Sequence, residues 1–364
     1  MTLFVLSAAS LGFEVSLTRL FSYLFIQSYV YILISLSVAG IGFGAVLTYY
    51  IYGKSRARLS SLVAPLPPFL VLLLFFINSY HTLLIPSLIL SFLIFFAVGI
   101  FQVLIFQESG IRPAYLYAAD LCGAALGSLF SFLLLNLGGA PNSLSISSLL
   151  LAVAGIVIYL SYYRRRRIAV GLLLLTTVAA GIGLFAGFES KLLPNKDWQK
   201  EMTVMLESEN RIAQIVETRW TAFGRVDLVK TENPLFRTMF IDGAAGTKMI
   251  EMKGGRVQES LARNLLFKYM GGIPLLVQEK EKKNRAAVIG SGGGIDVITL
   301  LLSGYRRIDA VEINPDFIDI VRSYSDYNGG IYSGQPKIEV YEDEGRSFLR
   351  GSDEDYNTIL MGLP

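Results

Sequence analysis

The chain has 364 residues, of which 53% are hydrophobic and 17% are charged, and its two parts have opposite net charge. Up to Phe188, nine Lys/Arg and three Asp/Glu give a net charge of +6, whereas 23 Lys/Arg and 26 Asp/Glu from Glu189 onward give −3. Neither part has the concentrated basic face that nucleic-acid binding requires, so nucleic acid is excluded as a partner. The single cysteine, Cys122, excludes a disulfide within the chain, and the single histidine, His81, excludes a histidine-rich metal site, so we expect no metal.

Residues 1–188 contain seven apolar stretches long enough to cross a bilayer. They lie at about 2–25, 28–52, 59–77, 83–106, 114–136, 144–163 and 168–188. We therefore expect a multi-pass α-helical membrane domain of about seven transmembrane helices, with the lipid bilayer as a partner. The first stretch is not read as a cleaved signal peptide, because it lacks a basic n-region and carries Glu14 and Arg19.

Charged residues inside these stretches are costly, so Glu14, Arg19 and Asp120 should face the interior of the helical bundle. They are read either as a polar pathway or as a clamp between helices. We favour the clamp, because three charges without a repeating pattern make a thin transport route. Small residues at close-packing spacing are expected to form packing seams rather than functional sites: Gly40, Gly42, Gly44, Gly123 and Gly127.

Basic residues predict the orientation of these helices but leave a conflict. Lys54, Arg56 and Arg58 follow the second stretch and 164–167 follow the sixth, so the positive-inside rule places both loops in the cytoplasm. A full seventh crossing would then put residues 189–364 outside, where nucleoside cofactors are scarce. Either 168–188 does not span fully, or another stretch is miscounted, or the domain is external. We favour a cytoplasmic domain on a cell membrane.

Residues 189–202 form a polar juxtamembrane linker, and 203–284 read as a small β-rich lead-in followed by a helix. Short runs of β-branched and aromatic residues predict strands over 211–219, 225–229 and 238–241, closed by a turn at Asp242-Gly243. Apolar residues at helical spacing over 258–270 predict a helix that stops at Gly271-Gly272.

Residues 285–364 begin with the pattern of a nucleotide-binding unit. An apolar run over 286–289 enters a glycine cluster, a helical stretch follows, and a second apolar run ends at Glu312, which is typical of half of a doubly wound α/β sheet. A dinucleotide fingerprint would need a third glycine where Ile295 stands. The spacing of Gly290, Gly292 and Gly294 is instead associated with S-adenosylmethionine-type cofactors.

An acidic residue ends each of the next two predicted strands. Glu312 follows Gly290 by 22 residues, where a carboxylate can accept both ribose hydroxyls. The run from Glu342 to Gly345 follows a third strand over 337–341. The alternative is structural: Glu312 would be a solvated carboxylate at a strand end, and the acidic run a charged turn.

With these motifs the chain resembles the membrane-anchored branch of the spermidine synthase-like proteins, a group within the S-adenosylmethionine-dependent methyltransferase-like superfamily. The matching pieces run across nearly the whole chain: GFEVSLTRLFS (12–22), WTAFGRVDLV (220–229), IDGAAGT (241–247), IGSGGGIDVITLLLSGYRRIDAVEINP (289–315) and YEDEGRSFLRGSDEDYNTILMGLP (341–364). The resemblance implies a β-rich lead-in and a Rossmann-like domain that is incomplete at its C-terminus, with four of seven strands present.

The resemblance also implies roles for individual residues. The glycine turn would hold the cofactor's tail, Glu312 its ribose, and the acidic run its adenine edge. The implied cofactor-binding residues are Gly290, Ser291, Gly292, Gly293, Gly294, Glu312, Ile313, Asp343, Glu344 and Gly345. The implied substrate residues are Asp242, Glu259 and Asp296.

Three departures from true spermidine synthases concern the acceptor. Gly293 stands where their glycine motif carries an acid, although Asp296 lies close in sequence. Their Tyr-His-Glu motif is reduced to 257–259, which keeps only the acid, Glu259. Their catalytic aspartate would follow Pro364, so we expect a truncated chain that is inactive as it stands.

The leading hypothesis is a membrane-anchored transferase that binds S-adenosylmethionine or its decarboxylated form and transfers an aminopropyl group to an amine. One alternative is a methyltransferase, since the missing acids weaken the case for a polyamine acceptor. Another is a membrane transporter or sensor whose nucleoside-binding domain performs no chemistry. The sequence leaves the acceptor and the oligomeric state open, a homo-oligomer included.

Overall fold

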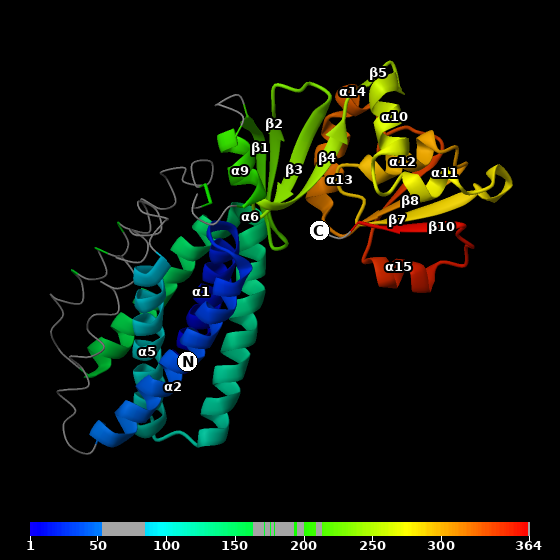
Figure 1. Cartoon of the computed structure of the whole chain (residues 1–364). Helices are drawn as coiled ribbons and strands as arrows, with labels where there is room; N and C mark the ends of the chain where they lie inside the picture. The colour runs from blue at the N-terminus through cyan, green and yellow to red at the C-terminus, as the bar shows by residue number, and fades with distance from the viewer. Residues whose placement is uncertain are drawn as a thin grey trace. The chain divides into compact units, whose positions relative to one another are not determined.

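The computed structural model describes residues 1–52, 84–162, 200–208 and 213–362, together with 171, 175, 178, 193 and 194 (Figure 1). The chain divides into two compact units. The first comprises Met1–Gln199 with Trp220–Gly224, and the second comprises Lys200–Arg219 with Arg225–Pro364.

Long apolar helices make up the described part of the first unit. They are α1 (Thr2–Leu24), α2 (Gln27–Tyr52), α5 (Leu84–Glu108) and α6 (Pro113–Tyr162). All 4 are long and apolar enough to cross a membrane. The backbone of α6 is not helical at Gly139, where φ is 72°, so the predicted stretches 114–136 and 144–163 are its two halves. The predicted stretch 59–77 and His81 lie outside the described residues, as does 168–188 except for three single positions.

Glycines allow these helices to approach closely. At four of the five predicted seam positions a Cβ atom would lie within 2.8 Å of a backbone oxygen on another helix: Gly40, Gly44, Gly123 and Gly127. At Gly127 the distance to the carbonyl oxygen of Ala8 would be 2.1 Å, so α1 and α6 touch backbone to backbone. At Gly42 a Cβ atom would meet nothing within 4 Å among the described residues, so the described helices form no seam there.

One charged residue of the apolar helices connects two of them. Asp120 on α6 accepts a hydrogen bond from the Ser7 hydroxyl on α1. This contact supports the clamp interpretation for Asp120, because a polar group in an apolar bundle is stabilised by a partner on the facing helix. Glu14 and Arg19 are partly buried.

The second unit begins with a small β-rich region. Its elements are α9 (Glu201–Ser208), β1 (Gln214–Thr221), β2 (Gly224–Lys230), β3 (Phe236–Ile241), β4 (Ala244–Ile250), β5 (Met252–Lys253), β6 (Arg256–Val257), α10 (Glu259–Phe267), α11 (Ile273–Leu276) and the 3₁₀ turn η2 (Lys280–Lys282). β1 to β4 form one sheet in sequential order, and β3 runs antiparallel to both β2 and β4. The three predicted strands and the predicted helix are confirmed. β4 was not predicted, because Gly246 and Lys248 interrupt its apolar pattern.

The remaining elements build a parallel sheet covered by helices (Figure 1). They are β7 (Arg285–Ile289), α12 (Ile295–Leu302), β8 (Arg307–Glu312), α13 (Pro315–Ser323), α14 (Ser325–Asn328), β9 (Ile338–Glu342), α15 (Gly345–Gly351) and β10 (Thr358–Met361). The strand order is β10-β7-β8-β9, with every pair parallel. The chain moves outward from β7 to β9 and returns beside β7, so the topological switch point lies between β7 and β10.

The core explains why this sheet forms. Ala286, Val288 and Ala310 are fully buried, as expected for central parallel strands with helices on both faces. The register pairs Ile289 with Val311 and Glu312 with Glu342, so the residues that follow β7, β8 and β9 meet at one edge of the sheet. That edge is where ligands bind in sheets of this class.

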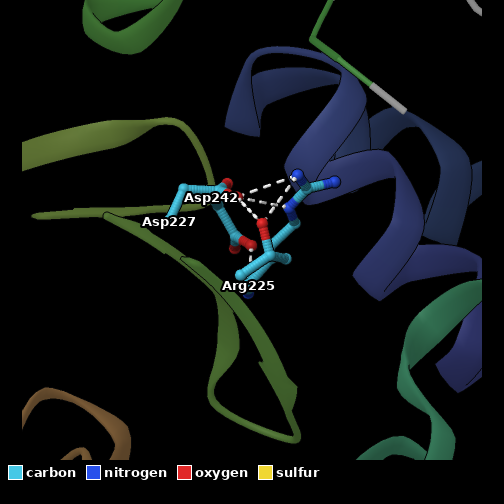
Figure 2. A network of polar contacts seen from close by, with 4 residues as sticks. Arg225, Asp227 and Asp242 are labelled. Carbon is cyan, nitrogen blue, oxygen red and sulfur yellow. Dashed lines mark hydrogen bonds and ion pairs between the residues drawn. The ribbon is translucent and has the colours of Figure 1, made fainter. Parts of the chain in front are cut away.

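A fully buried ion pair lies within the small sheet (Figure 2). Arg225 and Asp227 on β2 are both 0% exposed, and the guanidinium donates from Nε and Nη2 to Asp227 Oδ1 at 2.9 and 2.8 Å. Thr218 on β1 donates to the same oxygen at 2.6 Å. The backbone N–H of Arg225 donates to Asp242 Oδ1 at 2.9 Å. The network therefore connects β1, β2 and the turn between β3 and β4.

Candidate functional site

The glycine turn between β7 and α12 is held to the next strand by its backbone. The N–H groups of Gly290 and Ser291 both donate to the carbonyl oxygen of Val311, at 2.9 and 3.1 Å. Gly290 has a φ of 73° and Gly294, which precedes α12, has a φ of 89°, a region that side chains with a Cβ atom rarely adopt. The turn therefore needs glycine at both positions.

The small sheet packs directly against this turn. Thr247 Oγ1 on β4 accepts a hydrogen bond from the N–H of Gly293 at 3.1 Å. A Cβ atom on Gly293 would lie 2.7 to 2.8 Å from the carbonyl group of Lys248. An aspartate at position 293 would therefore require β4 to move. The contact leaves no room for an acidic side chain at position 293.

Glu312 lies beneath the glycine turn. Its carboxylate is buried and accepts from the N–H of Gly292 at 2.9 Å through Oε2 and from the N–H of Asn314 at 3.0 Å through Oε1. Each carboxylate oxygen can accept a second hydrogen bond, so acceptor capacity is left for ligand hydroxyls. The idea that Glu312 is a solvated carboxylate is wrong, because its side chain is buried and anchors the turn.

The acidic run after β9 divides into two roles. Glu344 caps α15 and accepts from the N–H groups of Arg346 and Ser347 at 3.0 and 2.9 Å, and these backbone bonds lower the pKa of its carboxyl group. Asp343 is exposed, and its own N–H donates to the carbonyl oxygen of Glu312 at 3.2 Å. Asp343 therefore lies at the predicted edge, whereas Glu344 has a structural function as a helix cap.

The other predicted cofactor residues lie around the same edge. Ile313, directly after Glu312, is 47% exposed, so it can offer an apolar surface to a flat ring. Gly345 lies against β7, since a Cβ atom there would meet Ile289 Cγ2 at 2.3 Å. Ser291 is buried within the turn. The structure thus brings the predicted cofactor-binding residues together along the ends of β7, β8 and β9.

Asp296, the first of the predicted substrate residues, lies beside the turn on the first turn of α12. Its Oδ1 accepts a hydrogen bond from the Tyr269 hydroxyl at 2.7 Å. Burial raises the pKa of Asp296, and the Tyr269 hydrogen bond partly opposes that rise. Burial, followed by the bond to Asp296, raises the pKa of Tyr269.

The other two predicted substrate residues have contacts away from the turn. Asp242 accepts a hydrogen bond from the backbone of Arg225 (Figure 2). Asp242 has a φ of 49°, and its carbonyl oxygen accepts from Lys200 Nζ at 2.7 Å. Glu259 begins α10, and its side chain is 87% exposed, 3.7 Å from Arg263. Their roles at a substrate site stay predictions.

Sequence reasoning missed three side chains that shape the site. Tyr332 is buried, and its hydroxyl donates to the carbonyl oxygen of Gly292 at 3.2 Å. Thr247 and Tyr269 approach from β4 and from the segment after α10. Thr247 lies within the quoted motif 241–247, which was a usable signal, whereas nothing in the pattern singled out Tyr269 or Tyr332.

A cleft of about 350 Å³ lies between the small sheet and α10. Tyr269 and Ile295 line one side, so the cleft reaches the start of α12. Lys248 and Lys268 also line it. Within the described residues no group of three or more His, Cys, Asp and Glu side chains is arranged to hold a metal ion.

Comparison with known proteins gives sequence relatives of one kind. No family model matches the chain. A polyamine aminopropyltransferase 1 from Streptomyces coelicolor is 24% identical over 388 residues, covering 100% of this chain and 68% of the relative. A polyamine aminopropyltransferase from Mycobacterium tuberculosis is 27% identical over 252 residues, covering 67% of this chain and 43% of the relative. The chain thus spans about two thirds of one relative and less than half of the other.

Similarity to solved structures is low. Spermidine synthase from Thermotoga maritima matches with a TM-score of 0.30 and 16% identity over 42% of this chain and 48% of that chain. The relation therefore depends on the sequence relatives and on the site described above. The parallel sheet and its glycine turn have the arrangement of a Rossmann-like unit. The chain is similar in sequence to polyamine aminopropyltransferases, which are transferases by name.

Proposed function

We propose that the protein binds decarboxylated S-adenosylmethionine at the glycine turn and transfers its aminopropyl group to an amine. The observation that carries this proposal is the buried Glu312 carboxylate, bonded to Gly292 at the carboxyl edge of the sheet. The relatives named polyamine aminopropyltransferase support the choice of reaction, and one of them aligns with all of this chain.

In the proposed reaction the lone pair of the acceptor amine attacks the methylene carbon beside the sulfonium. A C–N bond forms, the C–S bond breaks, and sulfur keeps the electron pair, so methylthioadenosine leaves. The amine's proton passes to a general base. The sulfonium is itself the leaving group, so the protein chiefly orients the two substrates. Glu312 would hold the ribose, the glycine turn the aminopropyl tail, and Asp343 the adenine edge.

Product analysis in detergent tests this reaction with the protein encoded by the whole gene, so that any residues that follow Pro364 are included. With decarboxylated S-adenosylmethionine and a mixture of amines, we expect release of methylthioadenosine, measured by chromatography. S-adenosylmethionine is supplied in a parallel reaction. Release of S-adenosylhomocysteine in that reaction, with no methylthioadenosine from the decarboxylated form, would show that the protein transfers a methyl group and not an aminopropyl group. Binding without any product would identify a sensor, and binding of neither cofactor would reject the nucleoside site.

We also propose that the helical unit anchors the protein in the cell membrane with the second unit in the cytoplasm. The length and apolar character of α1, α2, α5 and α6 support the anchor. A reporter active only in the cytoplasm, fused after the C-terminus, is expected to be active, and one active only outside is expected to be silent. The reverse pair of results would place the second unit outside. Extraction of the protein by carbonate without detergent would contradict membrane anchoring.

A further inference from the structure

Asp296 is a partly buried carboxylate without a cationic partner. Among the residues that the structure describes, no Lys or Arg forms an ion pair with it, and its recorded hydrogen bond comes from the neutral Tyr269 hydroxyl. Carboxylates that leave water are usually paired with a cation. On the neighbouring strand β8, Asp309 shows the ordinary arrangement, since it pairs with Arg285 at 2.9 Å. Asp296 therefore has unused capacity for a positive charge.

The position of this carboxylate favours a ligand cation over a structural one. Oδ1 faces Tyr269, while Oδ2 faces the end of β10, where a Cβ atom on Gly362 would lie 3.7 Å away. Gly362 in turn donates to the carbonyl oxygen of Ile289, directly before the glycine turn. The free oxygen thus lies between the ends of β7 and β10, at the switch point where sheets of this class bind ligands.

We propose that Asp296, oriented by Tyr269, binds a primary ammonium group of a bound substrate. This inference rests on the proposed function and specifies its site. Position 293 cannot supply a carboxylate for this ammonium group, because β4 leaves no room there for an acid, and Asp296 would supply it instead. The Tyr269 hydroxyl holds one carboxylate oxygen by a 2.7 Å bond, which leaves Oδ2 for the ammonium. Tyr269 acts through Asp296 and is a positioning residue.

The ammonium could belong to the aminopropyl tail of the cofactor or to the acceptor amine. Two ligand pairs separate these sources in calorimetric titrations of the full-length protein. S-adenosyl-3-thiopropylamine and methylthioadenosine differ in carrying or lacking the aminopropyl amine. Putrescine and butane-1,4-diol, titrated with methylthioadenosine at saturation, differ in carrying or lacking ammonium groups.

In Asp296→Asn we expect the affinity for either S-adenosyl-3-thiopropylamine or putrescine to fall about tenfold or more. This is the usual effect of losing a charge-assisted hydrogen bond. Methylthioadenosine affinity should be unchanged, which shows that the variant is folded. Tyr269→Phe should weaken the same ligand by a smaller factor and spare methylthioadenosine. Asp326→Asn, which removes an exposed carboxylate from the same unit, is the matched control and should change neither pair.

The outcomes separate the inference from the proposed function. A loss confined to S-adenosyl-3-thiopropylamine supports the cofactor as the source, and a loss confined to putrescine supports the acceptor. Unchanged affinities for both amines in Asp296→Asn, with methylthioadenosine still bound, would overturn the inference alone. A wild-type protein that binds none of these nucleosides would overturn the proposed function and the inference together.

Discussion

Replacement of Glu312 by glutamine is expected to weaken binding of methylthioadenosine by roughly 100-fold, since hydrogen bonds to a charged group contribute about 1.5–3 kcal/mol each. The carboxylate accepts from Gly292 and Asn314, and it would also accept from the ribose. Glutamine supplies only one acceptor oxygen, and its NH₂ group would face a backbone N–H. The substitution therefore disturbs the turn and removes a ribose acceptor at once. Calorimetric titration of the full-length protein measures the loss.

A matched variant distinguishes the site from general charge effects. Glu339→Gln removes an exposed carboxylate from β9, the strand beside Glu312, and should leave nucleoside affinity unchanged. Hydrogen exchange of the Gly290 to Gly294 amides then separates the two functions of Glu312. Faster exchange at the turn with unaltered affinity would mean that the carboxylate only shapes the turn and does not bind the ribose.

Removal of the buried carboxylate in Asp227→Ala should destabilise the small sheet by about 3–5 kcal/mol, the usual result of breaking a buried ion pair. Arg225 and Asp227 are both 0% exposed, so the variant leaves a guanidinium in the interior without its counter-charge (Figure 2). Thr218 also loses its acceptor. Native-state hydrogen exchange of the β2 and β3 amides in the full-length protein measures the free energy of local opening.

Two comparisons make this second prediction specific. Lys253 makes an exposed pair with Glu251 at 3.7 Å, and Lys253→Ala should change the opening free energy by less than about 0.5 kcal/mol. The double substitution Arg225→Met with Asp227→Leu removes both charges and should recover much of the loss. An Asp227→Ala variant that opens as rarely as the wild type would show that the pair does not stabilise the sheet.

Much of the candidate site could be predicted from the local sequence pattern. The runs before Gly290 and Glu312 alternate with a helical stretch, and the resulting strands lie within one or two residues of their predicted bounds. The carboxyl ends of parallel strands meet at one edge, so a glycine turn and a strand-end acid are brought together whenever the sheet forms. Three of the four strands of the parallel sheet follow from the same reasoning, whereas β10 was expected only from the family resemblance.

Contacts between distant segments could not be read in this way. Tyr269 meets Asp296 across 27 residues, and Thr247 meets Gly293 across 46. β4 lacked a strand pattern because Gly246 and Lys248 interrupt its apolar residues. Gly42 has the spacing of a packing residue but faces open space, since spacing does not determine which face of a helix meets a neighbour.

The amino-acid sequence alone determined the apolar helical half, the doubly wound sheet and the chemistry of its edge, because these depend on the period of apolar residues and on backbone conformations that glycine permits. Tertiary structure alone decided that Glu312 is buried and anchors the turn, that Glu344 caps a helix, and that position 293 has no room for an acid. The physical reason is that burial, steric exclusion and hydrogen-bond competition depend on which distant atoms pack within a few ångströms of a side chain.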